Sequence, residues 1–346
     1  MKRLIALTAA LLCLSGCTGG GDTYTTEFFA MDTFMSVSLR GDGAENSPQA
    51  QALADELMRG VNSLEPALSR TREDSDLYRL NHADGAVCTV GAQTYAAIED
   101  ALAFAELTGG AFDPTMAALT DLWGINTDAA RVPSQAEIDA ALAKTGYDKV
   151  ELLGNGQVRL HDGAQLDLGG IGKGFATDAM RDTWQAADGA AWSLMARLGG
   201  NVGAYGENPA REGGRWVVGI ADPDNSADYL ATVAVRDLSV VTSGDYERYF
   251  EQDGRRYHHI FDPSTGYPAE SGLRSVTVID QSSTRADALT TALFVMGPAR
   301  GMAFCEAQDI AAVFVTDTQE VRVTPRVHEL CEFSFLGAEK GYTDAA

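Results

Sequence analysis

The stretch DLGGIGKG, residues 167–174, places four glycines and one lysine between two segments of different periodicity. The preceding residues 156–166, GQVRLHDGAQL, alternate like a strand, and the residues from about 175 onward have the spacing of a helix. Glycine lets the backbone come close to a ligand, commonly a phosphate group at the start of a helix. The stretch predicts either a phosphate site with an exposed run of N–H groups or a tight strand-to-helix turn without a ligand.

Neither of the common nucleotide-binding glycine motifs fits this stretch. A Walker loop needs Ser or Thr after its Gly-Lys pair and Gly five residues before Gly172, but these positions hold Gly174 and Asp167. The dinucleotide pattern GxGxxG fails because Gly174 follows Gly172 one residue too early. The sequence therefore supports neither of the two nucleotide folds that these motifs mark.

The predicted elements around this stretch indicate an α+β protein. Alternating patterns predict strands at 27–40, 192–199, 215–221, 230–242, 256–261 and 273–280. Apolar spacing predicts helices at 49–60, 92–107 and 134–144, from about 175, from about 284, and from Asp113-Pro114 within 110–125. We expect a two-lobed mixture of sheet and helix, with a ligand site in the cleft between the lobes. The main domain is expected over 27–330, followed by a C-terminal tail at 331–346.

Composition limits the class of partner. The 346 residues are 45% hydrophobic, which is enough for a large core in one or two domains. The formal net charge is −23 at pH 7, so nucleic acid and anionic lipid surfaces would be repelled. A bound polyphosphate would then need a metal ion or backbone N–H groups to offset the charge. Cys88, Cys305 and Cys331 contain no CxxC spacing and are expected to be packed thiols or to form at most one disulfide, rather than a zinc site.

The N-terminus has the pattern of a bacterial lipoprotein signal. Lys2 and Arg3 precede an apolar run over 4–14, which is too short to span a bilayer but suits a signal peptide. The following Leu-Ser-Gly-Cys resembles a lipobox, so residues 1–16 would be removed and Cys17 lipidated. Residues 17–26 would form a flexible tether, and the protein would face outward from a bacterial membrane. An ordinary cleaved signal with an incidental cysteine is the alternative.

Asp287 and Thr291 form a second candidate site, because they are four residues apart on a predicted helix and share one face. A carboxylate and a hydroxyl without a nearby His or Cys favour Mg²⁺ over zinc. A solvated helix face or a cap is the alternative.

A third candidate is the segment RRYHHIFDPSTGYP, residues 255–268. His258 and His259 are adjacent on a predicted strand, so they point to opposite faces and cannot both serve one site. Asp262 begins the following turn, and Gly266 closes it. One histidine could act as a general base beside the aspartate, or it could be a satisfied residue of the sheet.

Together these segments resemble the ApbE-type FAD:protein FMN transferases, which are flavin-trafficking lipoproteins outside the cytoplasm. The resemblance covers roughly residues 27–327. It rests on the following segments: MDT (31–33), LSR (68–70), SDLYRLN (75–81), GAFDPT (110–115), DLGGIGKG, LGGN (198–201), TSGDYERYF (242–250), HHIFDPSTGYP (258–268) and ADALTTALFVMG (286–297).

The resemblance implies a substrate, a cofactor and a partner. FAD would be cleaved at its pyrophosphate with the help of Mg²⁺. FMN would pass to a threonine of an acceptor protein through a phosphoester bond, and AMP would leave. Two alternatives remain, namely a Mg²⁺-dependent FAD pyrophosphatase that uses water and a flavin-binding lipoprotein without catalysis.

The resemblance also implies roles for individual residues. Asp287 and Thr291 would bind Mg²⁺ together with the backbone carbonyl of Gly170. His259 would be the base or proton shuttle, and Asp262 would hold the turn. Contacts with FAD would come from Met31, Ser69, Ala111, Phe112, Asp113, Asp167, Lys173, His259 and Ile260. Family members vary at the position of Lys173, so backbone contacts are expected to matter more there than its side chain.

Overall fold

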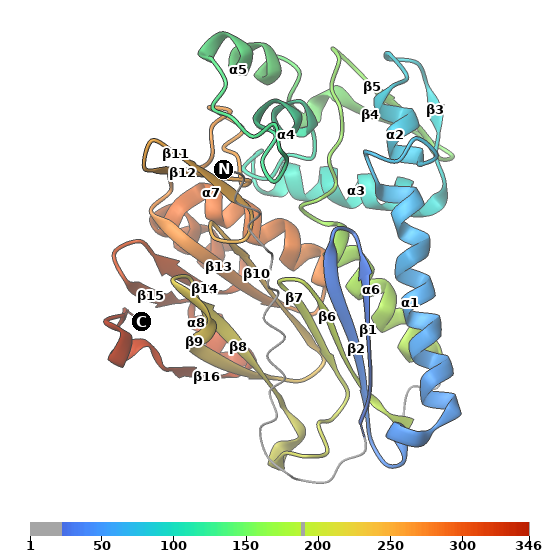
Figure 1. The fold of residues 1–346 in the computed structure, drawn as a ribbon, viewed down its shortest axis with the longest axis vertical. Coiled ribbons are helices and arrows are strands. Elements are labelled where there is room, and N and C mark those ends of the chain that lie inside the picture. Colours follow the sequence, from blue (N-terminus) through green and yellow to red (C-terminus); the bar gives the residue numbers. More distant parts are fainter. Residues whose placement is uncertain (1–22, 188–190, 346) are drawn as a thin grey trace, which may run out of the picture.

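A computed structural model describes residues 23–187 and 191–345 (Figure 1). The expected signal peptide and the lipidation site Cys17 lie outside the described residues. The mixed α+β class is confirmed, because helices alternate with strands that form several sheets.

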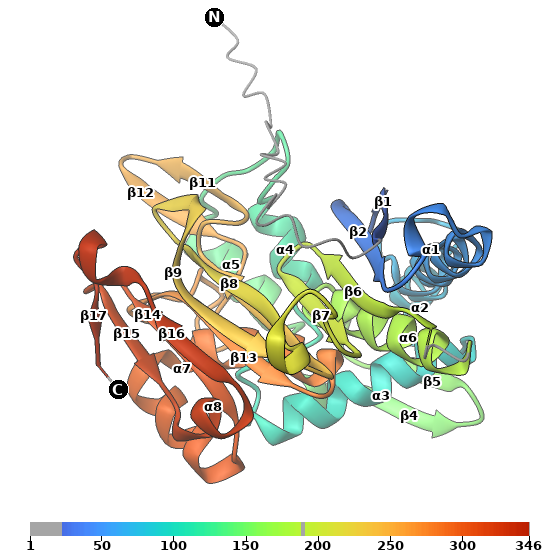
Figure 2. The same cartoon turned by 90° about the horizontal axis from the view of Figure 1, so that it is seen from below.

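A nine-stranded sheet runs through the molecule. Its order is β1 (Thr23–Ala30), β2 (Thr33–Arg40), β6 (Ser193–Leu198), β7 (Asn201–Tyr205), β10 (Leu238–Gly244), β13 (Leu273–Asp280), β14 (Ala311–Thr316), β15 (Glu320–Val323) and β17 (Thr343–Asp344). Neighbouring strands pair antiparallel except β15 and β17, which are parallel. The edges formed by β1 and by β17 lie at opposite sides of the molecule (Figures 1 and 2).

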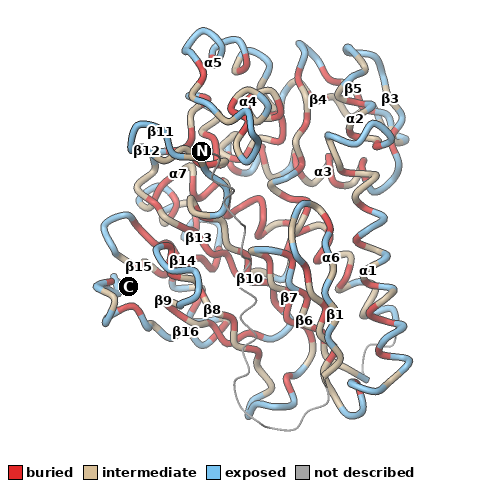
Figure 3. The backbone as a smooth tube through the Cα atoms, viewed as in Figure 1, coloured by how far each residue is buried: buried red, intermediate tan, exposed pale blue. Residues whose placement is uncertain are grey.

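The two faces of this sheet bury different partners. Three helices, α1 (Pro48–Leu68), α6 (Gly172–Ala186) and α7 (Ser283–Gln308), cover one face, and a three-stranded sheet of β16 (Glu332–Phe335), β9 (Asn225–Val235) and β8 (Trp216–Asp222) covers the other. Alternation along the strands divides the core accordingly: Val241 packs in the cluster with α7, whereas Val240 packs in the cluster with β8 and β9. Figure 3 shows in red the buried residues along the strands of the sheet.

A second group of elements lies at one end of the large sheet (Figure 1). It comprises α2 (Asp76–Asn81), α3 (Ala92–Leu107), α4 (Ala117–Trp123), α5 (Gln135–Leu142) and the small sheet of β3 (Cys88–Thr89), β5 (Gln157–Leu160) and β4 (Val150–Gly154). Trp123 links this group to the turn after the hairpin of β11 (Tyr249–Gln252) and β12 (Arg255–His258), because its indole N–H donates to the Gly266 carbonyl at 2.9 Å. A short helix, α8 (Pro325–Leu330), precedes β16.

Several expected boundaries change. The tether expected at 17–26 ends earlier, because β1 already begins at Thr23, and the expected tail at 331–346 contains the paired strands β16 and β17. The predicted strand 230–242 divides at Asp237, whose φ of 56° turns the chain between β9 and β10. The helix expected from Asp113-Pro114 begins only at Ala117.

Helix α7 is the only helix in the described part of the chain that is long and apolar enough to cross a membrane, with a mean hydropathy of 1.3. Half of that apolar window is buried inside the protein, against β10, β13 and α6. The helix changes direction at Gly297, whose φ is 75°, immediately before Pro298. We therefore interpret α7 as a core helix.

The starts of α6 and α7 touch at Gly174. A Cβ atom on this residue would lie 2.7 Å from both the carbonyl carbon of Ser283 and the Cα of Thr284. Asp178, one turn further along α6, accepts hydrogen bonds from the backbone N–H groups of Ser283 and Thr284, each at 2.9 Å. The absent side chain and this cap together fix the position of α7 on α6.

This contact predicts different effects for two neighbouring glycines. Gly174→Ala should lower the free energy of unfolding by about 1–3 kcal/mol or more, because the new methyl group meets backbone that cannot move alone. Gly172→Ala is the matched control, since nothing lies within 4 Å of its Cβ position, and it should change stability by less than about 1 kcal/mol. Denaturant unfolding of both variants checks this, and equal effects would contradict the close contact at Gly174.

Candidate functional site

The predicted cation ligands come together at the junction of the glycine-rich loop with α7. Asp287 is buried in the second turn of α7, and its Oδ2 accepts a hydrogen bond from the N–H of Gly174 at 2.8 Å. Thr291 lies one turn later and is half-buried; its Oγ1 is 3.7 Å from the position that a Cβ of Gly170 would take. The fold thus brings Gly170, Asp287 and Thr291 to one place, although they are far apart in sequence.

The surroundings of Asp287 are strongly polarised. Burial raises the pKa of this carboxyl, whereas Lys173 and the N–H of Gly174 act in the opposite direction. The Lys173 Nζ is 3.7 Å from Asp287 Oδ1, and its side chain is largely shielded from solvent. A carboxylate that is buried with so few compensating groups is suited to a cation.

The donor set fits Mg²⁺ only together with a substrate. A carboxylate, a hydroxyl and a carbonyl are all oxygen ligands, which Mg²⁺ prefers. Within residues 23–187 and 191–345, no three His, Cys, Asp or Glu side chains gather closely enough to hold a metal ion. Mg²⁺ commonly completes such a sparse set with water and substrate phosphate oxygens. In addition, the fully buried amide of Asn201 lies close enough to Asp287 to lower its pKa, but neither amide atom completes a hydrogen bond of ordinary geometry with the described residues.

The expected open run of N–H groups in the glycine-rich loop is wrong. The N–H of Gly169 donates to Asp167 Oδ1 at 2.9 Å, and that of Gly172 donates to the Leu168 carbonyl at 2.9 Å. The N–H of Ile171 also bonds Leu168, and that of Gly174 bonds Asp287. Most of the loop's N–H groups are therefore used to build the loop, and charge on a ligand must be balanced mainly by other groups.

Phe112 borders the loop directly. It is buried, and its ring carbon Cε2 lies 3.0 Å from the position of a Gly170 Cβ, so a side chain at residue 170 would require the ring to shift by a few tenths of an ångström. Ala111 precedes it and packs half-buried on the same core. Phe112 thus lies beside the glycine-rich loop, and the contact of this segment with FAD stays a prediction.

The Asp113 carboxylate accepts hydrogen bonds within its own turn and from the next segment. Oδ1 accepts from both the N–H and the hydroxyl of Thr115, at 2.8 and 2.5 Å, and Oδ2 accepts from the N–H of Tyr147 at 3.1 Å. Burial raises the pKa of this carboxyl, and these hydrogen bonds oppose the rise. The side chain shapes the GAFDPT turn, and its contact with FAD stays a prediction, as do those of Ala111 and Phe112.

Arg70 forms an ion pair with Asp167 and directly follows Ser69 in the chain. The Arg70 Nε is 3.1 Å from Asp167 Oδ2, and its Nη1 is 2.6 Å from Asp121 Oδ1. Burial disfavours the Arg70 charge, but the two carboxylates outweigh this and raise its pKa. Ser69 ends α1, and its hydroxyl accepts hydrogen bonds from the N–H groups of Thr71 and Arg72.

Met31 lies at the tip of the β1–β2 hairpin. Met31 and Asp32 form its two-residue turn and have φ values of 48° and 56°. Such left-handed conformations are unfavourable for residues other than glycine, Asn or Asp, and often mark functional positions. The hairpin reaches the glycine-rich loop, because the position of a Gly199 Cβ lies 3.1 Å from Thr33 Oγ1 and 3.7 Å from Lys173 Cδ.

The two histidines have different surroundings, as the alternation of a strand predicts. His258 is buried; its Nε2 is 3.2 Å from the Ala269 carbonyl, and its ring packs edge-on against Phe294. His259 is half-buried after the end of β12, where its Nδ1 is 3.3 Å from the Arg248 carbonyl. Burial, Arg248, His258 and Lys173 together lower the pKa of His259 to about 3. The charge of Lys173 therefore acts on both His259 and Asp287.

Asp262 organises the DPSTGYP turn. Its Oδ1 accepts from the N–H and hydroxyl of Ser264, at 2.8 and 2.7 Å, and its backbone carbonyl accepts from the N–H of Gly266 at 2.8 Å. Ile260 is buried and pairs through its carbonyl with the N–H of Ala269 at 2.9 Å. These contacts give Asp262 the turn-holding role that the resemblance implies.

Three further residues belong to the site but received no role from the sequence. Arg70 and Asn201 are described above. Glu247 places its Oε1 3.1 Å from the position of a Gly200 Cβ; the surrounding protein raises the pKa of this carboxyl, and Lys173 and Arg248 oppose the rise. The motifs LSR, LGGN and TSGDYERYF contain these residues, so the resemblance marked the segments but not the side chains.

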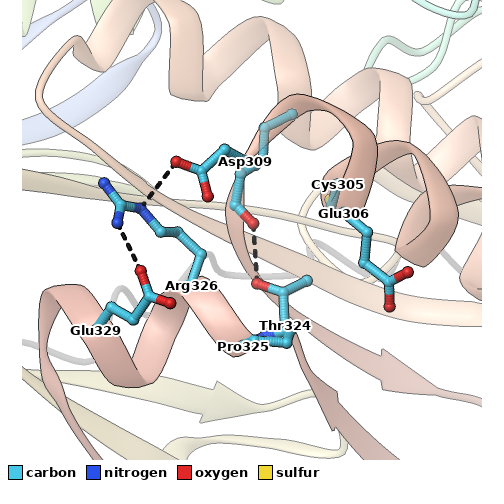
Figure 4. A pocket seen from close by; sticks show the side chains of 8 residues that line it. Cys305, Glu306, Asp309, Thr324, Pro325, Arg326 and Glu329 are labelled. Atoms are coloured by element: carbon cyan, nitrogen blue, oxygen red, sulfur yellow. Dashed lines mark hydrogen bonds and ion pairs between the residues drawn. The ribbon is translucent and has the colours of Figure 1, made fainter.

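The two best-formed cavities lie elsewhere. One of about 140 Å³, near the C-terminal end of α7, contains Arg326, which pairs with Asp309 and Glu329 (Figure 4). Its lining residues are Cys305, Glu306, Asp309, Ile310, Thr324, Pro325, Arg326 and Glu329. The other, of about 190 Å³, lies between α2 and β5. Neither is lined by a predicted site residue.

The described cysteines are free thiols, as the sequence analysis allowed. Cys88, Cys305 and Cys331 form no disulfide. Burial raises the pKa of Cys305 to about 12 and that of Cys331 to about 11. These two are therefore packed, unreactive side chains.

Comparison with known proteins connects this arrangement with a family. A model of the ApbE family matches residues 31–314. An FAD:protein FMN transferase of Treponema pallidum (strain Nichols) is 37% identical over 340 residues, which cover 92% of each chain.

Two solved structures share the fold. The ApbE protein of Thermotoga maritima is 35% identical, with a TM-score of 0.83 over 90% of this chain and 99% of that one. The apo flavinyl transferase ApbE of Pseudomonas stutzeri is 32% identical, with a TM-score of 0.78 over 90% of this chain and 97% of that one. The chain thus shares the α+β fold of these two ApbE structures. The chain is a member of the ApbE family.

The low pKa of His259 predicts an unusual pH profile for catalysis. The imidazole is neutral, and so able to accept a proton, down to about pH 4, rather than only above the ordinary histidine range of about 6 to 7. We expect kcat/KM for FAD to show no ascending limb from His259 between about pH 5 and 7.

The same histidine can be tested by substitution. His259→Ala should slow turnover by about 10²–10⁴-fold, whereas His258→Gln should act mainly on stability, since His258 packs in the core. A limb near pH 6.5 that disappears in His259→Ala would contradict the lowered pKa. Equal, small effects of both substitutions would rule out either imidazole as the base.

Proposed function

We propose that this chain is a Mg²⁺-dependent FAD:protein FMN transferase that attaches FMN through a phosphoester bond to a threonine of a partner protein and releases AMP. The transferase class is supported by membership of the ApbE family and by relatives that are named for this activity. The observation that supports the finer proposal is the meeting of Gly170, Asp287 and Thr291 at the start of α7.

The chemistry of the proposed reaction is a single displacement at phosphorus. The threonine oxygen forms a bond to the FMN phosphorus, the bond from that phosphorus to the AMP phosphate oxygen breaks, and the threonine proton passes to a base. Mg²⁺ held by Asp287, Thr291 and the Gly170 carbonyl would neutralise charge on the pyrophosphate oxygens.

The remaining functions are assigned to side chains of this chain. Lys173 supplies a positive charge beside Asp287, which offsets part of the repulsion between an acidic protein and FAD. His259 would accept the threonine proton; its low pKa keeps it neutral at pH 7 but also makes it a weak base. Asp262 would keep the turn after His259 in place.

We further propose that the enzyme is anchored outside the cytoplasm through a lipid on Cys17. The support is the short apolar run over 4–14 and the Leu-Ser-Gly-Cys sequence, followed by the glycine-rich sequence Thr-Gly-Gly-Gly-Asp.

The location is tested by fractionation. Cys17→Ser should move the protein from the membrane fraction to the soluble fraction without lowering the activity per molecule. Wild-type protein found in the cytoplasm with Met1 retained would contradict the anchor.

The proposed function is tested with purified chain, FAD, Mg²⁺ and a flavin-acceptor domain. We expect covalent flavin on the acceptor and AMP in equal amount. AMP and free FMN formed at the same rate with and without acceptor would instead show a pyrophosphatase. FAD bound without any AMP release would show a flavin-binding protein.

Substitution of the buried carboxylate tests the cation site. Asp287→Asn should lower turnover by at least about 10²-fold, because a charged ligand worth several kcal/mol is lost. The variant should stay folded, since burial already disfavours the Asp287 charge. Asp182→Asn, at an exposed carboxylate paired with Arg181, is the control and should keep full activity. Near-normal Mg²⁺-dependent turnover in Asp287→Asn would rule out the assignment.

A further inference from the structure

A buried amide on the central sheet lies against the proposed cation ligand Asp287. Asn201 is the first residue of β7 and follows the two-residue turn Gly199-Gly200. Its neighbours in the sheet are Leu198 of β6 and Val241 of β10, and both of these pack in clusters on the face that the helices cover. The register therefore directs the Asn201 side chain to the face covered by α6 and α7.

Burial of the Asn201 amide without hydrogen bonds of ordinary geometry lowers the stability of the folded state. Asn201 has no exposed surface, and neither Nδ2 nor Oδ1 completes a hydrogen bond of ordinary geometry with the described residues. It is nevertheless close enough to Asp287 to lower the pKa of that carboxyl. An unsatisfied buried polar group costs about 1–3 kcal/mol, so a purely structural position would favour an apolar residue.

The local fold does not depend on the amide. The Gly199-Gly200 turn is held by its backbone, since the Gly200 carbonyl accepts from the N–H of Thr242 at 3.0 Å. Gly199 has a φ of 59°, and a Cβ on Gly200 would lie 2.6 Å from the Thr242 carbonyl oxygen, so glycine itself sets the turn. The Asn201 side chain takes no part in these contacts.

Among the described residues, the Asp287 carboxylate has one hydrogen bond of ordinary geometry, although Asn201 and Lys173 lie close enough to lower its pKa. Its Oδ2 accepts from the N–H of Gly174, and Lys173 is 3.7 Å from Oδ1, beyond a normal hydrogen bond. A carboxylate that binds a metal needs a second partner to fix its plane, and loss of such a partner costs about 10–100-fold in metal affinity.

We propose that Asn201 is a positioning residue of the cation site, whose Nδ2–H group donates to the Asp287 carboxylate when a divalent cation is bound and so directs a lone pair at the cation. This inference rests on the proposed function, because it presupposes that Asp287 binds the cation. Asn201 acts through Asp287 and touches neither phosphorus nor the acceptor.

The test separates cation affinity from stability. Mn²⁺ is titrated by electron paramagnetic resonance into the full chain with ADP present as a diphosphate probe. Asn201→Leu should weaken Mn²⁺ binding by about 10–100-fold. The same variant should melt no lower than wild type, because an apolar group of similar shape replaces an unpaired amide.

A matched control has the same kind of defect away from the site. The Ser271 hydroxyl is also buried without a partner among the described residues, so Ser271→Ala should leave Mn²⁺ affinity unchanged. Asn201→Ala serves as the second variant if leucine prevents folding, and the same loss of affinity is expected.

The following results would overturn the inference. Unchanged Mn²⁺ affinity in a folded Asn201 variant would assign the amide to something other than the cation site. A loss of affinity equal to that in Ser271→Ala would show a general packing effect. Failure of the wild type and of Asp287→Asn alike to bind Mn²⁺ would overturn the proposed function together with this inference, whereas binding that depends on Asp287 but not on Asn201 would overturn the inference alone.

Discussion

The close contact between α6 and α7 at Gly174 is the constraint on which the rest of the site depends. Because residue 174 has no side chain, the first turns of the two helices meet backbone to backbone, and the Gly174 N–H reaches the buried Asp287. Asp178 caps the start of α7 from α6 and holds the same contact from the other side. The glycine-rich loop before α6 is thereby carried to Thr291, which lies one turn beyond Asp287.

Electrostatics follow from this packing. The acidic chain buries the Asp287 carboxylate beside Lys173, and it places Arg70 and Arg248 around the same loop and turn. Lys173 stabilises charge at Asp287 and disfavours it at His259, so one cation favours an ionised ligand and a neutral base at the same pH. This division of protonation states suits a reaction in which a pyrophosphate is bound and a hydroxyl proton is removed.

The sequence predicted the elements that local patterns specify. The bounds of α3 and β13 match the predicted 92–107 and 273–280, and the capping box of Ser134 and Glu137 is present at the start of α5. The spacing of Asp287 and Thr291 indicated a shared face, which the helix confirms. These features depend on residues a few positions apart.

Features that depend on distant residues could not be predicted in this way. The carboxylate of Asp113 accepts a hydrogen bond from the N–H of Tyr147, 34 positions later, and no local pattern contains this contact. The loop's N–H groups are used internally, which the glycine pattern alone does not show. Asn201 acquires its place only through the register of β6, β7 and β10, which no local pattern contains.

In the proposed function, one cation joins the α6–α7 junction to the pyrophosphate of FAD. The most direct measurement is the anomalous difference density of a crystal soaked with Mn²⁺ and FAD. We expect a single Mn²⁺ peak between the Asp287 carboxylate, the Thr291 hydroxyl and the Gly170 carbonyl, in contact with a phosphate oxygen. FAD bound with its pyrophosphate away from these three oxygens, or a Mn²⁺ peak at other residues, would contradict it.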